Sequence, residues 1–145
     1  MANLEQFSRH MVVRADRLPI KAAELQREVA MTVHENLVYG TPVDTGLARS
    51  NWLMSIGKSR TDVIPQYSYG NFLGISETKN AVQAITQAIT ALQSHKPGQD
   101  IYDTNNVHYI ETLGRGHSRQ ASAGWIPLAI QAGLEAVRTK RLLGP

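Results

Sequence analysis

The sequence predicts an α+β fold with a long N-terminal helix, a small antiparallel sheet and two further helices. Three observations support this prediction: apolar residues recur every three or four positions in three stretches, they alternate with polar residues in a fourth, and glycine or proline separates these stretches. The 145 residues contain no internal repeat and no linker-like tract. We therefore expect a single domain over residues 1–145.

The first helix is expected over residues 18–39. Pro19 suits a first helical turn, and Gly40 suits the left-handed position that follows a helix. The apolar face of this helix consists of Leu18, Ala22, Leu25, Val29, Val33 and Leu37. A shorter amphipathic segment precedes it, so residues 1–16 are expected to form a separate N-terminal arm. The apolar positions of this segment are Leu4, Phe7 and Met11.

The other elements are shorter. Residues 51–58 alternate between apolar and polar side chains, as a half-buried strand does. Residues 60–76 contain proline, glycines and aromatic residues and are expected to form a long loop. Helical spacing predicts a second helix over 78–94 and a last one over 126–141, with a short strand at 100–104 between them.

Composition excludes several classes of protein. The chain has 15 Lys and Arg against 12 Asp and Glu, and this net charge of +3 is too small to indicate a nucleic-acid binder by itself. It has no cysteine, which excludes disulfides, thiolate nucleophiles and sulfur-ligated zinc. Its apolar runs are too short to span a bilayer, and it starts without a signal-peptide pattern, so no membrane association or secretion is expected.

Asp44-Thr45-Gly46 is the sharpest short motif. Asp-Thr-Gly is the active-site signature of aspartic proteases, in which two such loops bring two carboxylates together. One copy in this chain would require a homodimer. Those proteases are almost entirely β, whereas this sequence predicts helices, so a turn in which Gly46 adopts positive φ is the favoured interpretation. The protease stays as the alternative function.

No other constellation indicates an enzyme. No pair of histidines has the spacing of four residues that places two ligands on one helix face. The five histidines are His10, His34, His95, His108 and His117. A metal site can be drawn from His108, Glu111 and His117, but exposed loop histidines are the commoner explanation. No glycine-rich phosphate loop is present, so we expect no cofactor and no metal.

The C-terminal part of the chain is basic. Its cations are Arg115, Arg119, Arg138, Lys140 and Arg141. They could contact phosphates without reading sequence, but cations at the end of a helix also complement its dipole, and this is the favoured interpretation for the last three.

Two segments together resemble a known family. The first is Thr41-Pro42-Val43-Asp44-Thr45-Gly46, followed by Ala48-Arg49 and Asn51-Trp52. The second is Asn105-Asn106-Val107-His108-Tyr109, continuing through Leu113, Gly116, Ser118, Gln120-Ala121 and Gly124. In this order they resemble the signature of the tail-completion and neck proteins of tailed bacteriophages, the group of minor tail protein Z-like head–tail connectors. The departures from the usual residues are His108 for Pro, Gly114 for Glu, Ser122 for Pro and Trp125 for Met.

The resemblance implies a structural virion protein without enzymatic activity. Several copies, six or alternatively twelve, would form a ring around the DNA channel at the head–tail joint. Its neighbours would be a portal-adaptor protein and a tail-terminator or tail-tube protein, and assembly would take place in the host cytoplasm. The residues expected to hold the turns and interfaces are Thr41, Pro42, Asp44, Thr45, Gly46, Asn105, Asn106, Tyr109, Gly116, Ser118, Gln120 and Gly124.

Large aromatic side chains are the candidate contacts with partners, because a few large side chains usually dominate an interface. These are Tyr67, Tyr69, Phe72 and Trp125. For Trp125 the alternative is that it fills the core of the domain.

Overall fold

A computed structural model describes residues 4–42, 46–69, 75–116 and 121–142 and confirms the α+β class. The elements in chain order are α1 (Leu4–Gly40), α2 (Leu47–Ser50), β1 (Leu53–Ile56), α3 (Ile75–Leu92), β2 (Ile101–Thr104), α4 (Ile110–Gly114) and α5 (Trp125–Leu142). Helices α3 and α5 and both strands agree with the prediction within a few residues, and α1 includes the whole of the predicted first helix. The short helices α2 and α4 were not expected.

The N-terminal helix is longer than predicted. α1 has 37 residues and contains Pro19 in its interior, so both the separate arm at residues 1–16 and the placement of Pro19 in a first turn are wrong for the described residues from Leu4 onward. Proline removes only one helical hydrogen bond, and the apolar spacing continues on both sides of it. The same periodicity therefore belongs to one helix rather than two.

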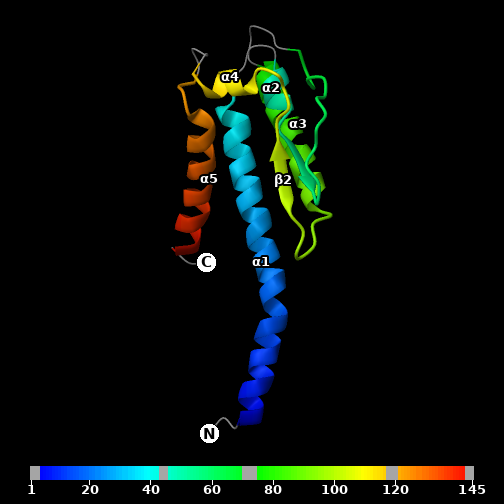
Figure 1. Cartoon of the computed structure of the whole chain (residues 1–145), viewed down its shortest axis with the longest axis vertical. Helices are drawn as coiled ribbons and strands as arrows, with labels where there is room; N and C mark the ends of the chain where they lie inside the picture. The colour runs from blue at the N-terminus through cyan, green and yellow to red at the C-terminus, as the bar shows by residue number, and fades with distance from the viewer. Residues whose placement is uncertain (1–3, 43–45, 70–74, 117–120, 143–145) are drawn as a thin grey trace.

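α1 is the axis of the molecule (Figure 1). Helix α5 packs along one side of its C-terminal half, and the sheet and α3 lie on the other side. The N-terminal half of α1 extends away from this body, and every residue from 4 to 22 is exposed. The chain thus has a packed body and a projecting helical arm.

The sheet consists of β1 and β2 in antiparallel register, with Leu53 opposite Thr104 and Ile56 opposite Ile101. On its other edge, β1 is held by a side chain of α3. The Gln87 amide accepts a hydrogen bond from the Met54 backbone N–H at 2.9 Å and donates one to the Met54 carbonyl at 2.8 Å. This glutamine makes the pair of bonds that a neighbouring strand would otherwise make.

The core lies between α1, α3 and α5. One cluster contains Leu37, Val38, Trp52, Ala81, Ala84 and Trp125, and a second contains Met54, Ala88 and Leu92. Three alanines of α3 (Ala81, Ala84 and Ala88) are fully buried, which allows this helix to approach the sheet and α1 closely. The indoles of Trp52 and Trp125 meet edge to face, with ring centroids 6.5 Å apart.

Candidate functional site

The two segments of the resemblance, far apart in the sequence, meet at the end of the body where α1 finishes and α5 begins (Figure 1). The Asn105 side-chain amide donates a hydrogen bond to the Ala48 carbonyl at 2.8 Å and so joins one segment directly to the other. The same side chain accepts the Val107 N–H at 3.2 Å, which shapes the turn after β2. We call this end the signature end of the molecule.

The first segment is held by its own side chains. The Thr41 hydroxyl donates to the Leu37 carbonyl at 2.6 Å and accepts the indole N–H of Trp52 at 2.7 Å. Thr41 and Pro42 are both buried. Gly46 has φ of +83°, which confirms the predicted left-handed glycine of this turn. A Cβ at Gly46 would overlap the amide nitrogen of Asn80, so the position is restricted by packing as well as by φ.

Residues 57–69, which have neither helix nor strand, are fixed by two buried asparagines. Asn51 accepts the Ile64 N–H at 2.7 Å and donates to the Ile64 carbonyl at 2.8 Å. Asn80 binds the N–H and carbonyl of Ser68 in the same way, at 2.7 and 2.8 Å. Each amide replaces a pair of backbone hydrogen bonds that this loop lacks. No motif in the sequence marks Asn80, but a polar side chain that is buried inside a helical segment must find hydrogen-bond partners there.

The described part of the second segment also has structural contacts. Asn106 is exposed and donates to the Arg60 carbonyl at 3.0 Å, while Tyr109 is half-buried at the start of α4. Gly116 and Gly124 have φ of +94° and +78°, and the Gly124 N–H binds the Gly114 carbonyl at 2.8 Å. These glycines turn the chain from α4 into α5.

Some predicted site residues lie outside the described residues. They are Asp44, Thr45, Phe72, Ser118 and Gln120.

Of the candidate partner contacts, the described ones differ in exposure. The Tyr69 side chain is 79% exposed. Tyr67 is half-buried against the core, and this burial raises the pKa of its phenol. Trp125 is only 6% exposed, and its indole donates to the Leu113 carbonyl at 3.0 Å. The structure therefore favours the core role for Trp125 over the role of a partner contact.

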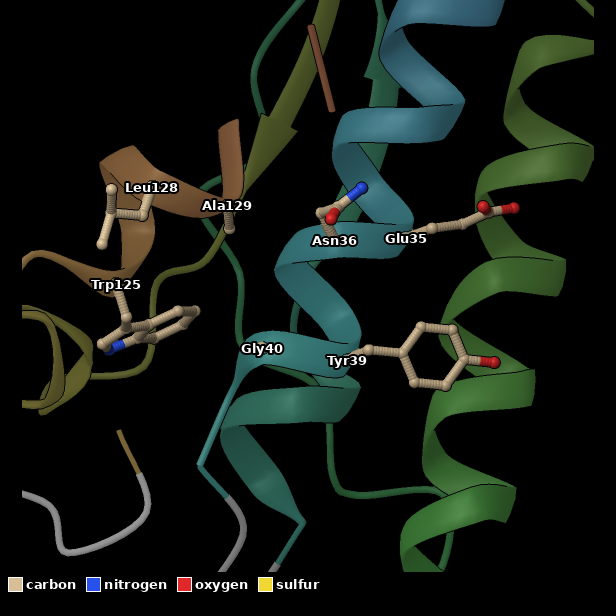
Figure 2. Close-up of a pocket in the computed structure, with 7 residues that line it drawn as sticks. All are labelled: Glu35, Asn36, Tyr39, Gly40, Trp125, Leu128 and Ala129. Carbon is tan, nitrogen blue, oxygen red and sulfur yellow. The ribbon is translucent and has the colours of Figure 1, made fainter. Parts of the chain in front are cut away.

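A shallow hollow of about 600 Å³ lies beside the signature end (Figure 2). Trp125, Leu128 and Ala129 line it from α5, and the remaining lining residues come from the last turns of α1. Leu128 and Tyr39 are 59% and 60% exposed. The surface of the hollow is mostly apolar.

His34 is fully buried between three elements. Its Nδ1 lies 2.8 Å from Asp103 Oδ2, and its Nε2 lies 3.1 Å from the Ala84 carbonyl. Both ring nitrogens thus have partners within the chain. No group of three His, Asp or Glu side chains suited to a metal ion occurs among the described residues. His117, one of the three residues of the metal site considered from the sequence, lies outside the described residues.

The basic C-terminal turn is partly neutralised by α1. Lys140 and Arg141 each approach a different carboxylate oxygen of Glu28 at 2.7 Å. The hydrogen bond from Lys140 is the main cause of a lowered pKa of this carboxyl. Arg138 lies 3.5 Å from Glu135. Arg138, Lys140 and Arg141 thus lie at the end of α5, as the dipole interpretation expects, and each has a carboxylate partner within the chain.

Comparison of the chain with protein-family models, with curated proteins and with solved structures finds no match. Within the described residues, no helix combines the length and hydropathy needed to cross a membrane.

The framework around the Asp44 loop is not the one that the protease alternative requires. The described strands are two segments of four residues, and the loop follows the long helix α1. Aspartic proteases place this motif in an almost entirely β chain, whereas the described residues here are mostly helical.

Proposed function

We propose that this chain is a structural subunit of a tailed-phage virion, which forms a ring around the DNA channel at the head–tail joint. A hexamer is the expected assembly and a dodecamer the second choice. The neighbours are a portal-adaptor protein on one side and a tail-terminator or tail-tube protein on the other. The protein takes its place in the neck after synthesis in the host cytoplasm.

The observation that carries the proposal is the meeting of the two signature segments. A chance match of two short motifs gives no reason for them to be neighbours in space. Here Asn105 of one segment binds Ala48 of the other, and Trp52 of the first packs on Trp125 at the end of the second. The resemblance thus involves residues that depend on one another for their positions.

The surface at this end also supports an assembly role. In a cyclic ring, one patch of each subunit meets a different patch of the next. Tyr69 is 79% exposed, and the hollow beside Leu128 offers a second apolar area on another element. Exposed aromatic and apolar side chains of this kind are typical of contact surfaces.

Complementation tests the proposal. A phage in which the gene for this chain is inactivated should accumulate separate heads and tails. Expression of the parent chain in the host should restore joined particles. Tyr69→Ser should melt like the parent, because the side chain is exposed, yet should restore fewer particles. Normal joining in the complete absence of the chain would contradict the proposal.

The protease alternative has its own test in the same assay. Asp44→Asn removes the carboxylate that such an enzyme requires while keeping a side chain able to form a turn. We expect this variant to restore joined particles as the parent does. Loss of joining together with loss of a peptide-cleaving activity would support the protease instead.

A further inference from the structure

The projecting part of α1 carries an unusually apolar face. Its residues, which we call the arm stripe, recur every three or four positions and are Leu4, Phe7, Met11, Ala15, Leu18, Ala22 and Leu25. All of them are exposed, with Leu4 at 84%, Phe7 at 58%, Met11 at 49% and Leu18 at 64%. A continuous exposed apolar stripe of this length indicates a contact surface.

The arm stripe continues a face that is already a helix–helix contact. Further along α1 the same face includes Val33, against which α5 packs at Gly133 so closely that a Cβ there would lie 2.8 Å from the Val33 Cα. The last turn of α5 reaches α1 at Glu28. On the N-terminal side of Glu28, no described residue of the chain covers the stripe.

The arm gains no burial inside its own chain. Residues 4–22 are all exposed and include Pro19, which removes a helical hydrogen bond. Most helical stability in proteins comes from packing of an apolar face rather than from intrinsic propensity. A helix that covers the stripe, as α5 covers its continuation, would supply the missing contact.

The charges beside the stripe favour one orientation for such a helix. His10, Arg14, Arg17 and Lys21 follow one border of the stripe at spacings of four, three and four. None of these arginines and lysines has a described salt-bridge partner, and no acidic residue interrupts their row. Two antiparallel arms would set this basic border against itself, whereas two parallel arms set it against the other border, which carries Asp16 and also Glu5, the latter paired with Arg9 of its own helix.

We propose that the arm stripe is covered by the arms of other copies of this chain, packed in parallel. The inference rests on the proposed function in one respect: subunits of a cyclic ring share one direction along the axis, as parallel arms require. The arms then form a helical bundle beside the ring of bodies. Their helices become more stable on assembly, because the exposed apolar side chains are removed from water.

Matched double variants test whether the stripe is the contact. Met11→Gln and Leu18→Gln remove two stripe residues, whereas Val13→Gln and Ile20→Gln remove two apolar residues of similar exposure on the opposite side of the helix. In sedimentation experiments on the purified chain, we expect the parent to associate and the stripe variant to need about a hundredfold higher concentration. The control variant should stay within about threefold of the parent.

Cysteine cross-linking tests the orientation, since the natural chain has no cysteine. Parallel arms in register place each Leu4 beside another Leu4, and each Leu18 beside another Leu18. Leu4→Cys and Leu18→Cys should therefore each form disulfide-linked dimers alone. Linkage only in a mixture of the two variants would overturn the parallel arrangement.

Sedimentation uses the purified chain, while complementation uses particles, so this inference and the proposed function fail separately. Equal association of the stripe variant and the parent would overturn the inference. A parent that stays monomeric up to about 1 mM would do the same and point to a different protein as the occupant. Neither result would affect head–tail joining by the parent chain, which decides the proposed function.

Discussion

The signature end and the arm of this protein are stabilised in opposite ways. At the signature end, short elements and a loop are fixed by buried side chains, such as Asn51, Asn80 and the two tryptophans. In the arm, residues 4–22 are regular helix but bury nothing. Regular secondary structure and packing are therefore separate properties: the irregular region is held by many contacts within the chain, whereas the described residues of the arm are exposed along their whole length.

The largest effect is expected from Trp125. Trp125→Ala removes a side chain that is 6% exposed and also leaves the Leu113 carbonyl without its indole donor. We expect a loss of about 3–5 kcal/mol in the free energy of unfolding, measured by urea denaturation. Leu128→Ala, at a residue of the same helix that is 59% exposed, should cost less than about 1 kcal/mol. Equal losses would show that Trp125 is not part of the core.

The next largest effect is expected from Gly46→Ala. Comparison with Gly57→Ala separates the cost of backbone strain from the cost of packing. Gly46 and Gly57 have similar φ values of +83° and +77°, but only a Cβ at Gly46 meets other atoms. Gly57→Ala should cost about 1 kcal/mol through φ alone. Gly46→Ala should cost at least about 2 kcal/mol, because Asn80 must also give up its bonds to Ser68. Similar midpoints in chemical denaturation for both variants would contradict the asparagine contact.

A smaller effect is expected from the pH dependence of the α1–α5 contact. The lowered pKa of Glu28 means that its carboxylate contributes stability above the usual value of 4.5 and loses it as the pH falls through the lower folded value. Glu28→Gln should therefore melt below the parent at about pH 6, and the difference should shrink towards about pH 3. Glu24→Gln, which removes a nearby carboxylate without a described salt-bridge partner, serves as the control variant. A difference independent of pH would contradict the ion pair.

Pro19→Ala is expected to have the smallest effect on the stability of the body. It should, however, clearly slow hydrogen exchange in the arm. The new N–H restores a helical hydrogen bond to the Ala15 carbonyl, so amides of residues 4–18 should exchange more slowly with solvent in the monomeric chain. The melting temperature of the body should change by less than about 2 °C, since these residues are exposed. A large rise in the melting temperature would show that arm and body unfold together.

Local patterns in the sequence were sufficient to predict the fold class, α3, α5, the C-terminal half of α1, both strands and the left-handed Gly46. These follow from periodicity and from residue conformation, which are local properties of the chain. The sequence also determined the residues that carry the resemblance, but not why they occur together.

The contacts between these residues are a property of the tertiary structure. A side-chain amide such as Asn80 can bind any backbone pair within reach, and packing alone brings Ser68 to it. Packing also decided that Trp125 is buried and that Lys140 and Arg141 bind Glu28. The continuity of α1 through Pro19 was ambiguous in the sequence, because proline is tolerated in a first turn and, at a cost, inside a helix. The difference between the covered and uncovered parts of one apolar stripe arises from where α5 ends on α1, which no local pattern in α1 contains.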